Sequence, residues 1–219
     1  MRDTIIDYIK RNRVSTTEVA DCLGKSGALP NVAAVNRGYF RVGKIRYAYA
    51  VNQSNWPIHE RVIDTKENDV VFIDSINCGG RAMIGELVSK YILLYRQAAA
   101  IVTNAPMRDA AALMRENYPI WCNGFNPNGC FNTDPGDVSG ETAITKGMEY
   151  YEGAIAVCDD CGVVIIPKEY HNEAFYQKLI NIEKQEDIWF DRLDHFKENT
   201  FEIVCQKNYL NDEEYMKKY

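Results

Sequence analysis

Short segments rich in β-branched and aromatic residues alternate in this chain with segments of helical periodicity, and this order limits the fold more than any other feature. The expected strands cover residues 45–51, 70–73, 99–103 and 119–125, followed by a close pair at 154–157 and 163–166. Strands that alternate with helices pack as layers. The pattern therefore predicts a layered α/β domain.

The helices are marked by apolar spacing and by capping residues. Near the start, one face of a short helix carries three isoleucines, Ile5, Ile6 and Ile9. In the segment STTEVADCLG, Ser15 and Glu18 form a capping box, and Gly24 suits the left-handed end of the helix. We therefore expect two consecutive helices before the first strand.

Three more helices are expected further along the chain. From Ile84 to Arg96 the apolar residues recur every three or four positions and are expected to form one face of an amphipathic helix: Ile84, Leu87, Val88, Tyr91, Ile92 and Tyr95. Another helix covers residues 109–116, where Asp109 can act as the N-cap, and a long one begins near Asn172. The polar tail from Asn208 is expected to be loosely held.

Composition and charge narrow the class of protein. The 219 residues are 46% hydrophobic and 26% charged, which is typical of one globular domain, and we expect a core over about 14–190 with a helical extension over 191–219. The net charge of -6 disfavours nucleic acid as a partner. The sequence has neither a signal peptide nor an apolar run of about 20 residues, so a cytoplasmic protein is expected.

Seven cysteines are scattered along the chain, and we expect them to be reduced thiols. Only Cys158 and Cys161, in CDDCGVVIIP, have the spacing of metal ligands, and no second pair completes a zinc site. A tight turn between two strands is the simpler interpretation of this pair.

Five segments, in this order, resemble the landmarks of the RraA-like family: STTEVADCLG, GGRAMIGEL, NAPMRDAAAL, YPIWCNGFNP and CDDCGVVIIP. The family is related to class II pyruvate aldolases and includes regulator of ribonuclease E activity A and 4-hydroxy-4-methyl-2-oxoglutarate aldolases. The resemblance covers roughly residues 14–190. It implies a single three-layer β/β/α domain of the swivelling type, assembled as a homotrimer or a larger ring.

The same resemblance implies a divalent-metal-dependent lyase, an aldolase or a decarboxylase, that acts on a small 2-oxo acid through a pyruvate enolate. Arg108 would stabilise the enolate oxygen, because a guanidinium offers a fixed fork of donors to developing negative charge. Asp109 would support the metal, Mg²⁺ or Mn²⁺, which polarises the same oxygen.

The substrate carboxylate needs a receptor of its own. Free amides and the positive end of a helix dipole favour anions, so the backbone around Gly85, Glu86 and Leu87 is the candidate. Glu86 also matches an acidic position of the family near the metal, and we interpret it as a group that handles protons.

Simpler interpretations exist for each site residue. Asp109 can be only an N-cap, and Arg108 only a solvated surface arginine. The three histidines occur in unrelated contexts without the spacing of metal ligands, so each is interpreted as a surface or partly buried side chain: His59, His171 and His195.

Two departures from the family pattern concern the approach to Arg108. The family commonly has an Asp-Gly pair where this chain has Asn104 and Ala105. The segment from Glu86 to Arg108 is also one residue longer than usual, which predicts a small bulge or an adjusted helix end. Two alternative functions therefore stay open: a non-catalytic RraA-like regulator that binds a protein such as a ribonuclease, and an enzyme that acts on a sugar-acid-like substrate.

Overall fold

The computed structural model describes residues 1–136 and 140–218, and its centre is a seven-stranded sheet. The strands follow one another along the chain as β1 (Ala33–Ala34), β2 (Arg41–Val51), β3 (Val70–Ile76), β4 (Ala100–Thr103), β5 (Ile120–Cys122), β6 (Ile155–Asp159) and β7 (Gly162–Ile166). In space their order is β1-β5-β4-β3-β2-β6-β7. Strands β2 to β5 are parallel, whereas β1, β6 and β7 pair antiparallel.

The helices of the described ranges fall into two groups. Those on the body of the molecule are α1 (Arg2–Asn12), α2 (Thr16–Cys22), α3 (Trp56–Val62), α4 (Glu86–Lys90), the π-helix η1 (Tyr91–Tyr95), α5 (Ala110–Arg115), α6 (Glu141–Tyr151) and the 3-10 helix η2 (Lys168–Tyr170). The C-terminal group consists of α7 (Glu173–Phe196), η3 (Phe201–Gln206), η4 (Asn208–Asn211) and α8 (Glu213–Met216).

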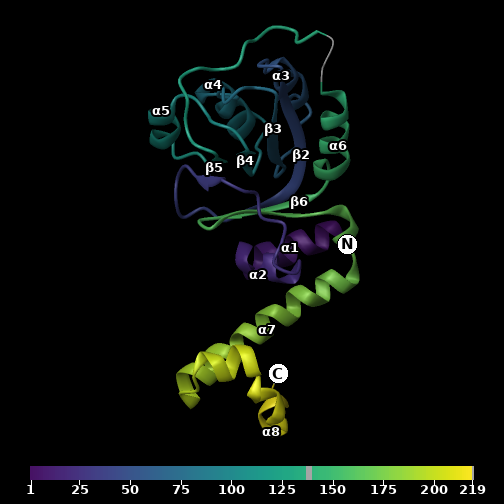
Figure 1. Cartoon of the computed structure of the whole chain (residues 1–219), viewed down its shortest axis with the longest axis vertical. Coiled ribbons are helices and arrows are strands. Elements are labelled where there is room, and N and C mark those ends of the chain that lie inside the picture. Colours follow the sequence, from purple (N-terminus) through teal and green to yellow (C-terminus); the bar gives the residue numbers. More distant parts are fainter. Residues whose placement is uncertain (137–139, 219) are drawn as a thin grey trace.

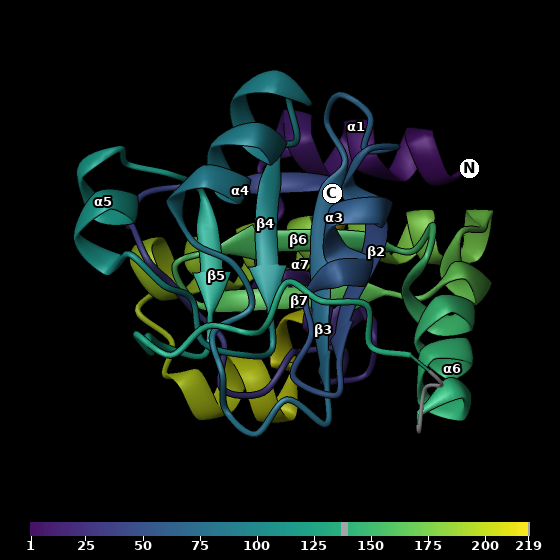
Figure 2. The same ribbon diagram turned by 90° about the horizontal axis from the view of Figure 1, so that it is seen from above.

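Strand β2 belongs to both halves of the sheet and divides the fold into layers. Its first residues, 41–44, pair with β6, and residues 45–51 pair with β3. Figure 2 shows β6 and β7 crossing behind the parallel strands. The large side chains of Tyr47, Phe72 and Trp121 are buried in the core that these two parts of the sheet share. The α/β single domain with stacked β/β/α layers is therefore confirmed.

Helices cover both outer faces of these layers. On the parallel strands, α3, η1 and α5 bury apolar residues that include Ile58, Ile92 and Leu113. Below β6 and β7, helices α1, α2 and α7 form an additional layer (Figure 1). The isoleucine face of α1 is buried there, and the capping box of α2 is present, with Ser15 N donating to Glu18 Oε2 at 2.7 Å.

Several strands and helices differ from the sequence-based expectations. Strand β5 ends at Cys122 rather than at residue 125, because Gly124 turns the chain with a φ of 115°. The two-residue β1 was not predicted, nor were helices α3 and α6, which lie in segments without long apolar periodicity.

The helix predicted for residues 84–96 begins at Glu86 and ends as the π-helix η1. A π-helical turn accommodates one residue more than an α-helical turn, so η1 is an adjusted helix end of the kind expected in this segment. Its apolar face differs from the prediction. Leu87 is 82% exposed and Tyr95 is 71% exposed, whereas Ser89 is buried and donates to the Gly85 carbonyl.

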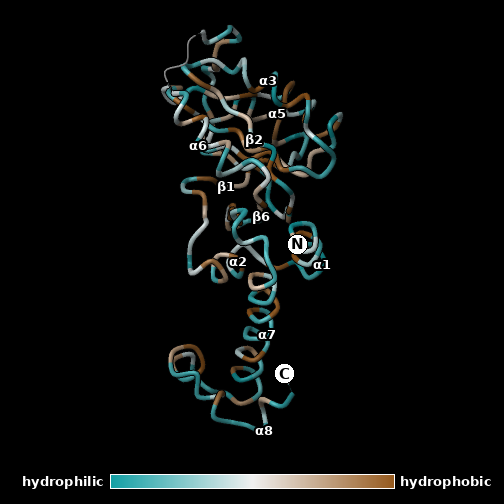
Figure 3. Tube along the Cα trace, turned by 90° about the vertical axis from the view of Figure 1, so that its right-hand side faces the viewer, coloured by the Kyte–Doolittle hydropathy of each residue, from teal (hydrophilic) through white to brown (hydrophobic). Residues whose placement is uncertain are grey.

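The C-terminal group extends away from the body. Phe175 and Leu179 pack the first half of α7 on the core, and the rest projects outward with the short helices that follow (Figures 1 and 3). The expectation of a loosely held tail is wrong for residues up to 218, because Tyr209 and Tyr215 are buried against Ile188. None of the helices in the described ranges combines the length and the apolarity needed to cross a bilayer.

The pair Cys158 and Cys161 lies at the hairpin of β6 and β7, as the simpler interpretation predicted. Asp159 Oδ1 accepts from the Cys161 amide at 2.8 Å and closes the turn. Residues 1–136 and 140–218 contain no cluster of three His, Cys, Asp or Glu side chains that could hold a metal. Burial raises the pKa of the Cys158 thiol, as expected for a structural cysteine.

Candidate active site

A cavity of about 210 Å³ lies beyond the carboxyl ends of the parallel strands. Each strand leads into one part of its wall: β2 into residues 55–59, β3 into 82–88, β4 into 108–109 and β5 into 129–132. Ligands of open α/β sheets bind in this position, because the loops after parallel strands converge at one edge. The volume suits a small metabolite.

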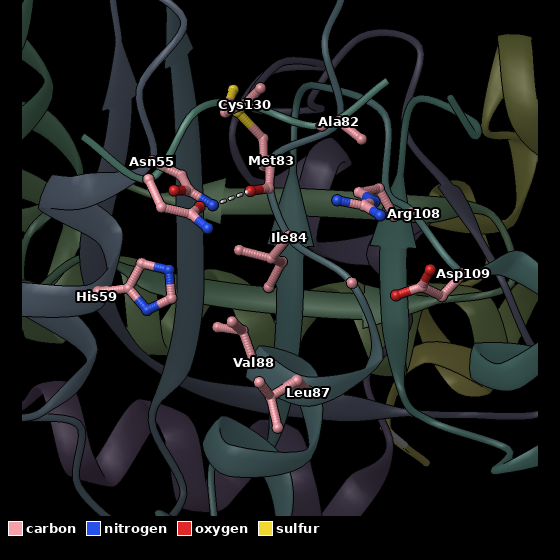
Figure 4. Close-up of a pocket in the computed structure, with 13 residues that line it drawn as sticks. Asn55, His59, Ala82, Met83, Ile84, Leu87, Val88, Arg108, Asp109 and Cys130 are labelled. Carbon is pink, nitrogen blue, oxygen red and sulfur yellow. Dashed lines mark hydrogen bonds between the residues drawn. The ribbon is translucent and has the colours of Figure 1, made fainter. Parts of the chain in front are cut away.

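Arg108 provides the positive charge of the cavity (Figure 4). Its amide donates to the Ile84 carbonyl at 2.9 Å, which fixes the backbone next to the loop after β3. A Cβ on Gly129 would lie 2.9 Å from Arg108 Nη1, so glycine at that position leaves room for the guanidinium. Within the described ranges no carboxylate lies within salt-bridge distance of Arg108. The guanidinium can therefore bind an anion.

Asp109 has a backbone conformation that is uncommon outside glycine, with φ 58° and ψ 38°. It occupies the N-cap position of α5, but its side chain makes no capping hydrogen bond there. Instead, Asp109 Oδ2 accepts from the Glu86 amide at 2.9 Å. The N-cap interpretation is thus wrong for α5, because the carboxylate is directed to the first residue of α4.

Glycine at position 85 makes this contact possible. A Cβ there would lie 2.1 Å from Asp109 Oδ2, which is closer than any real Cβ contact. The sequence-predicted Arg108 and Asp109 therefore do meet the start of α4. The Glu86 amide is already used by Asp109, whereas the amides of Gly85 and Leu87 have no acceptor in the described part of the chain.

The Glu86 side chain does not line the cavity. Its Oε1 lies 3.6 Å from Arg115 Nη2 on α5, and both side chains are largely exposed. Its assignment to proton handling stays a prediction.

Asn55 and His59 form the wall opposite Arg108 and Asp109, and the sequence analysis did not assign either to the site (Figure 4). Both belong to the start of α3, one helical turn apart. Asn55 Nδ2 donates to the Met83 carbonyl at 3.0 Å, while Asn55 Oδ1 is buried without a donor among the described residues. The i, i+4 spacing of an Asn and a His was the available signal, but it is weak without a predicted helix.

One thiol lines the cavity and a second contacts it. Cys130 lines the cavity, and Cys78 is buried in contact with Cys130. A hydrogen bond with Cys130 lowers the pKa of Cys78 below that of an ordinary thiol. The same interaction, together with burial, raises the pKa of Cys130. The thiol that faces the cavity is therefore protonated at neutral pH.

Asn104, one of the departures from the family pattern, binds a carboxylate instead of providing one. Its Nδ2 donates to Asp74 Oδ1 at 2.6 Å, and its Oδ1 accepts from the Ser75 amide at 3.0 Å. Asp74 also accepts from the Tyr47 hydroxyl at 2.9 Å. The hydrogen bonds of Asn104 thus connect β3 to the loop that leads to Arg108.

Comparison with known proteins identifies the family. The RraA-like family, described as Aldolase/RraA, matches residues 16–165, and the chain belongs to it. A protein of Halalkalibacterium halodurans named "Putative 4-hydroxy-4-methyl-2-oxoglutarate aldolase" is 26% identical over 170 residues, which are 77% of this chain and 80% of that protein.

Two solved structures share the fold. An uncharacterized protein from Pseudomonas syringae pv. tomato has a TM-score of 0.66 at 17% identity, covering 87% of this chain and 92% of its own. Streptomyces coelicolor RraAS2, described as an unusual member of the RNase ES inhibitor RraA protein family, has a TM-score of 0.65 at 19% identity, covering 84% of this chain and 96% of its own.

Proposed function

We propose that this protein is a divalent-metal-dependent lyase, an aldolase or a decarboxylase, that cleaves a small 2-oxo acid through a pyruvate enolate. One observation carries the proposal: an unpaired guanidinium, a carboxylate and the free amides at the start of α4 converge on one small cavity. The relative that is named as an aldolase agrees with this chemistry.

The residues present fit a Mg²⁺ or Mn²⁺ ion. Asp109 uses Oδ2 to accept from the Glu86 amide, so Oδ1 is available to a cation. Mg²⁺ in enzymes is commonly held by one or two carboxylates, with water and substrate oxygens completing the shell, and this fits a site with a single carboxylate. When bound, the ion would polarise the 2-oxo group as a Lewis acid.

The remaining groups have complementary roles. Arg108 donates to the oxygen that becomes negative as the carbon–carbon bond breaks, and such preorganised donors stabilise the transition state more than the ground state. The amides of Gly85 and Leu87 would bind the substrate carboxylate. The side chains of Ile84 and Val88 line the cavity and limit the access of water.

We further propose that the protein works in the cytoplasm as a homotrimer or a larger ring. The free cysteines are consistent with a reducing compartment. Beside the cavity, an apolar surface on α4 and η1 exposes four large side chains: Leu87, Tyr91, Leu94 and Tyr95. A neighbouring subunit would bury this surface, and light scattering after size-exclusion chromatography tests the assembly.

The direct test measures pyruvate release from oxaloacetate and from 4-hydroxy-4-methyl-2-oxoglutarate. Turnover is expected with Mg²⁺ or Mn²⁺ and is expected to be lost in excess chelator. No metal-dependent turnover over a broad panel of 2-oxo acids, including sugar-acid-like ones, contradicts the proposal.

A regulator that binds a ribonuclease is the second candidate, because the similar RraAS2 structure is described as belonging to an RNase ES inhibitor family. The acidic chain could cover a basic partner surface. A stable ribonuclease complex whose affinity is unchanged by Arg108→Ala, together with absent turnover, favours this candidate over the lyase.

A further inference from the structure

The cavity contains four ionisable side chains, and three of them are poor proton carriers. Arg108 is a guanidinium, a group that does not release its proton in proteins and so cannot act as a base. Asp109 accepts from the Glu86 amide and is the carboxylate that fits the metal. Cys130 has a raised pKa because of burial and of Cys78. His59 is the remaining group, and imidazole is the side chain best suited to accept and to donate a proton near neutrality.

The position of His59 suits this task. Figure 4 shows its ring on the wall opposite Arg108 and Asp109, beside Asn55. The residue is exposed, so its proton can exchange with water. In the described ranges its imidazole has no hydrogen-bond partner, so neither ring nitrogen is already used by the protein.

Buried side chains and hydrogen bonds hold helix α3, which carries His59, in place. Ile58 and Val62 are buried beneath it, and Ser54 Oγ accepts from the Trp56 amide at 3.2 Å at the start of the helix. Asn55 Nδ2 binds the Met83 carbonyl, which joins α3 to the loop that carries Gly85. The two walls are therefore held at a defined separation, as a reacting constellation requires.

We propose that His59 is the general base and general acid of the reaction, an inference that rests on the proposed function. In the cleavage of a 4-hydroxy-2-oxo acid, neutral His59 takes the proton of the 4-hydroxyl group. The O–H electron pair forms the new carbonyl at carbon 4, and the pair of the broken bond between carbons 3 and 4 forms the double bond between carbons 2 and 3. The 2-oxo oxygen becomes the enolate oxygen beside Arg108.

The proton then returns to the substrate. The imidazolium of His59 protonates carbon 3, the enolate becomes pyruvate, and the imidazole is neutral again. The hydroxyl proton thus ends on the pyruvate methyl group, and no further reactant is consumed. His59 is therefore expected to catalyse exchange of the methyl protons of free pyruvate in D₂O as well, because removal and return of that proton are the second step and its reverse.

The test uses the full chain with Mg²⁺ and two variants, His59→Gln and His59→Ala. Loss of a general acid or base typically costs about 10²–10⁴ in rate, so kcat for cleavage is expected to fall by about 100-fold or more. Exchange of the pyruvate methyl protons, followed by NMR in D₂O, is expected to fall equally. The dissociation constant of pyruvate, measured by calorimetry, is expected to change by less than about threefold, because Arg108 and the α4 amides stay in place.

Added imidazole separates a chemical role from a structural one. It is expected to restore part of the exchange rate to His59→Ala and nothing to His59→Gln, whose side chain fills the site. His195→Gln is the matched control, since His195 is exposed, pairs with Asp191 at 2.8 Å and lies in the last turn of α7, the helix that extends away from the sheet (Figure 1). Its cleavage rate is expected to equal that of the original protein.

The outcomes separate failure of the role of His59 from failure of the proposed lyase activity. If the original protein cleaves and exchanges, and both His59 variants do so at an unchanged rate, the role of His59 is overturned while the lyase stands. If the variants lose activity together with pyruvate binding and gain nothing from imidazole, His59 has a structural role and the inference also fails. If the original protein shows neither reaction with any 2-oxo acid, the lyase fails and the inference fails with it.

Discussion

The two walls of the cavity differ in how their residues are held. On one wall, Arg108 and Asp109 are neighbours in sequence, and backbone contacts with the loop after β3 fix them: the Arg108 amide to the Ile84 carbonyl, and the Glu86 amide to Asp109. On the other wall, the packing of α3, the hydrogen bond from the Asn55 side chain to the Met83 carbonyl and the hydrogen bond from the Asn55 amide to the Phe131 carbonyl hold the helix that carries His59. Both walls are thus joined to the loop after β3 by contacts between residues far apart in the sequence, the first wall through backbone groups next to its charged side chains and the second through the Asn55 side chain.

This difference suggests a division of labour. The wall with a fixed charge binds and polarises the 2-oxo acid, whereas the wall with a titratable ring moves the proton. Changes on the first wall should therefore affect binding and chemistry together, and changes on the second should affect mainly kcat. The following predictions test this division, beginning with the largest effect.

Replacing Arg108 should have the largest effect. Arg108→Ala removes the donor to the enolate oxygen, and loss of one such donor costs about 10²–10³ in kcat. Arg108→Lys keeps the charge without the fork of donors and should restore only part of the activity. Steady-state kinetics of pyruvate release measures both. Equal kcat/KM for the alanine variant and the original protein contradicts the role of this wall.

A methyl group on the first wall should have the next largest effect. Gly85→Ala directs Cβ to 2.1 Å from Asp109 Oδ2, so the carboxylate must move, and we expect a loss of ~10-fold or more in apparent Mg²⁺ affinity. Gly129→Ala is the matched control. Its Cβ meets Arg108 Cδ at 2.8 Å, on a flexible side chain that can shift, so Mg²⁺ affinity should change little. A metal titration of activity compares the two, and identical affinities contradict the geometry of Asp109.

On the second wall, Asn55→Ala should lower stability by about 1 kcal/mol, because the hydrogen bond to the Met83 carbonyl is lost from a buried site. The cost is limited because the unpaired Oδ1 is removed at the same time. Asn132→Ala, on an exposed residue of the same cavity, should leave stability unchanged. Urea unfolding measures the free energies, and equal values for both variants contradict a support role for Asn55.

The smallest expected effect concerns the pH dependence of stability and involves His171, a histidine outside the site. Burial lowers the pKa of His171, near Ile166, below its ordinary value of 6.5. A histidine whose pKa is lowered on folding contributes its full stability above pH of about 6.5 and loses that contribution as pH falls. His171→Gln should therefore weaken the loss of stability between about pH 7 and 5 and leave cleavage unchanged. Melting temperatures across this range test it, and an unaltered pH dependence contradicts it.

Most of the fold could be predicted from the sequence where a segment carries its own signal. The isoleucine face of α1, the capping box at Ser15 and the hairpin around Asp160 are local patterns, and each occurs where expected. Helix α3 was missed because Ile58 and Val62 give only one apolar repeat in seven residues. The exposed face of α4 and η1 was misassigned because periodicity does not report which apolar side the monomer leaves uncovered.

The residues of the candidate site likewise fall into those that the sequence predicted and those that it did not. Arg108, Asp109 and Gly85 could be found because they lie in segments that resemble family landmarks. His59 was grouped with His171 and His195, since in the sequence all three are isolated histidines. Only the loop connections after β2, β3 and β4 bring His59 to the cavity of Arg108. Contacts between residues far apart in the chain cannot be predicted from the pattern of a short segment.

A crystal soaked with Mg²⁺ and pyruvate tests the central claim most directly. The account predicts electron density for pyruvate between the two walls, with its 2-oxo oxygen on Arg108, its carboxylate at the amides of Gly85 and Leu87, and the ion on Asp109. Pyruvate bound at another place in the molecule, or metal density that avoids Asp109 while Arg108 stays free of ligand, contradicts it.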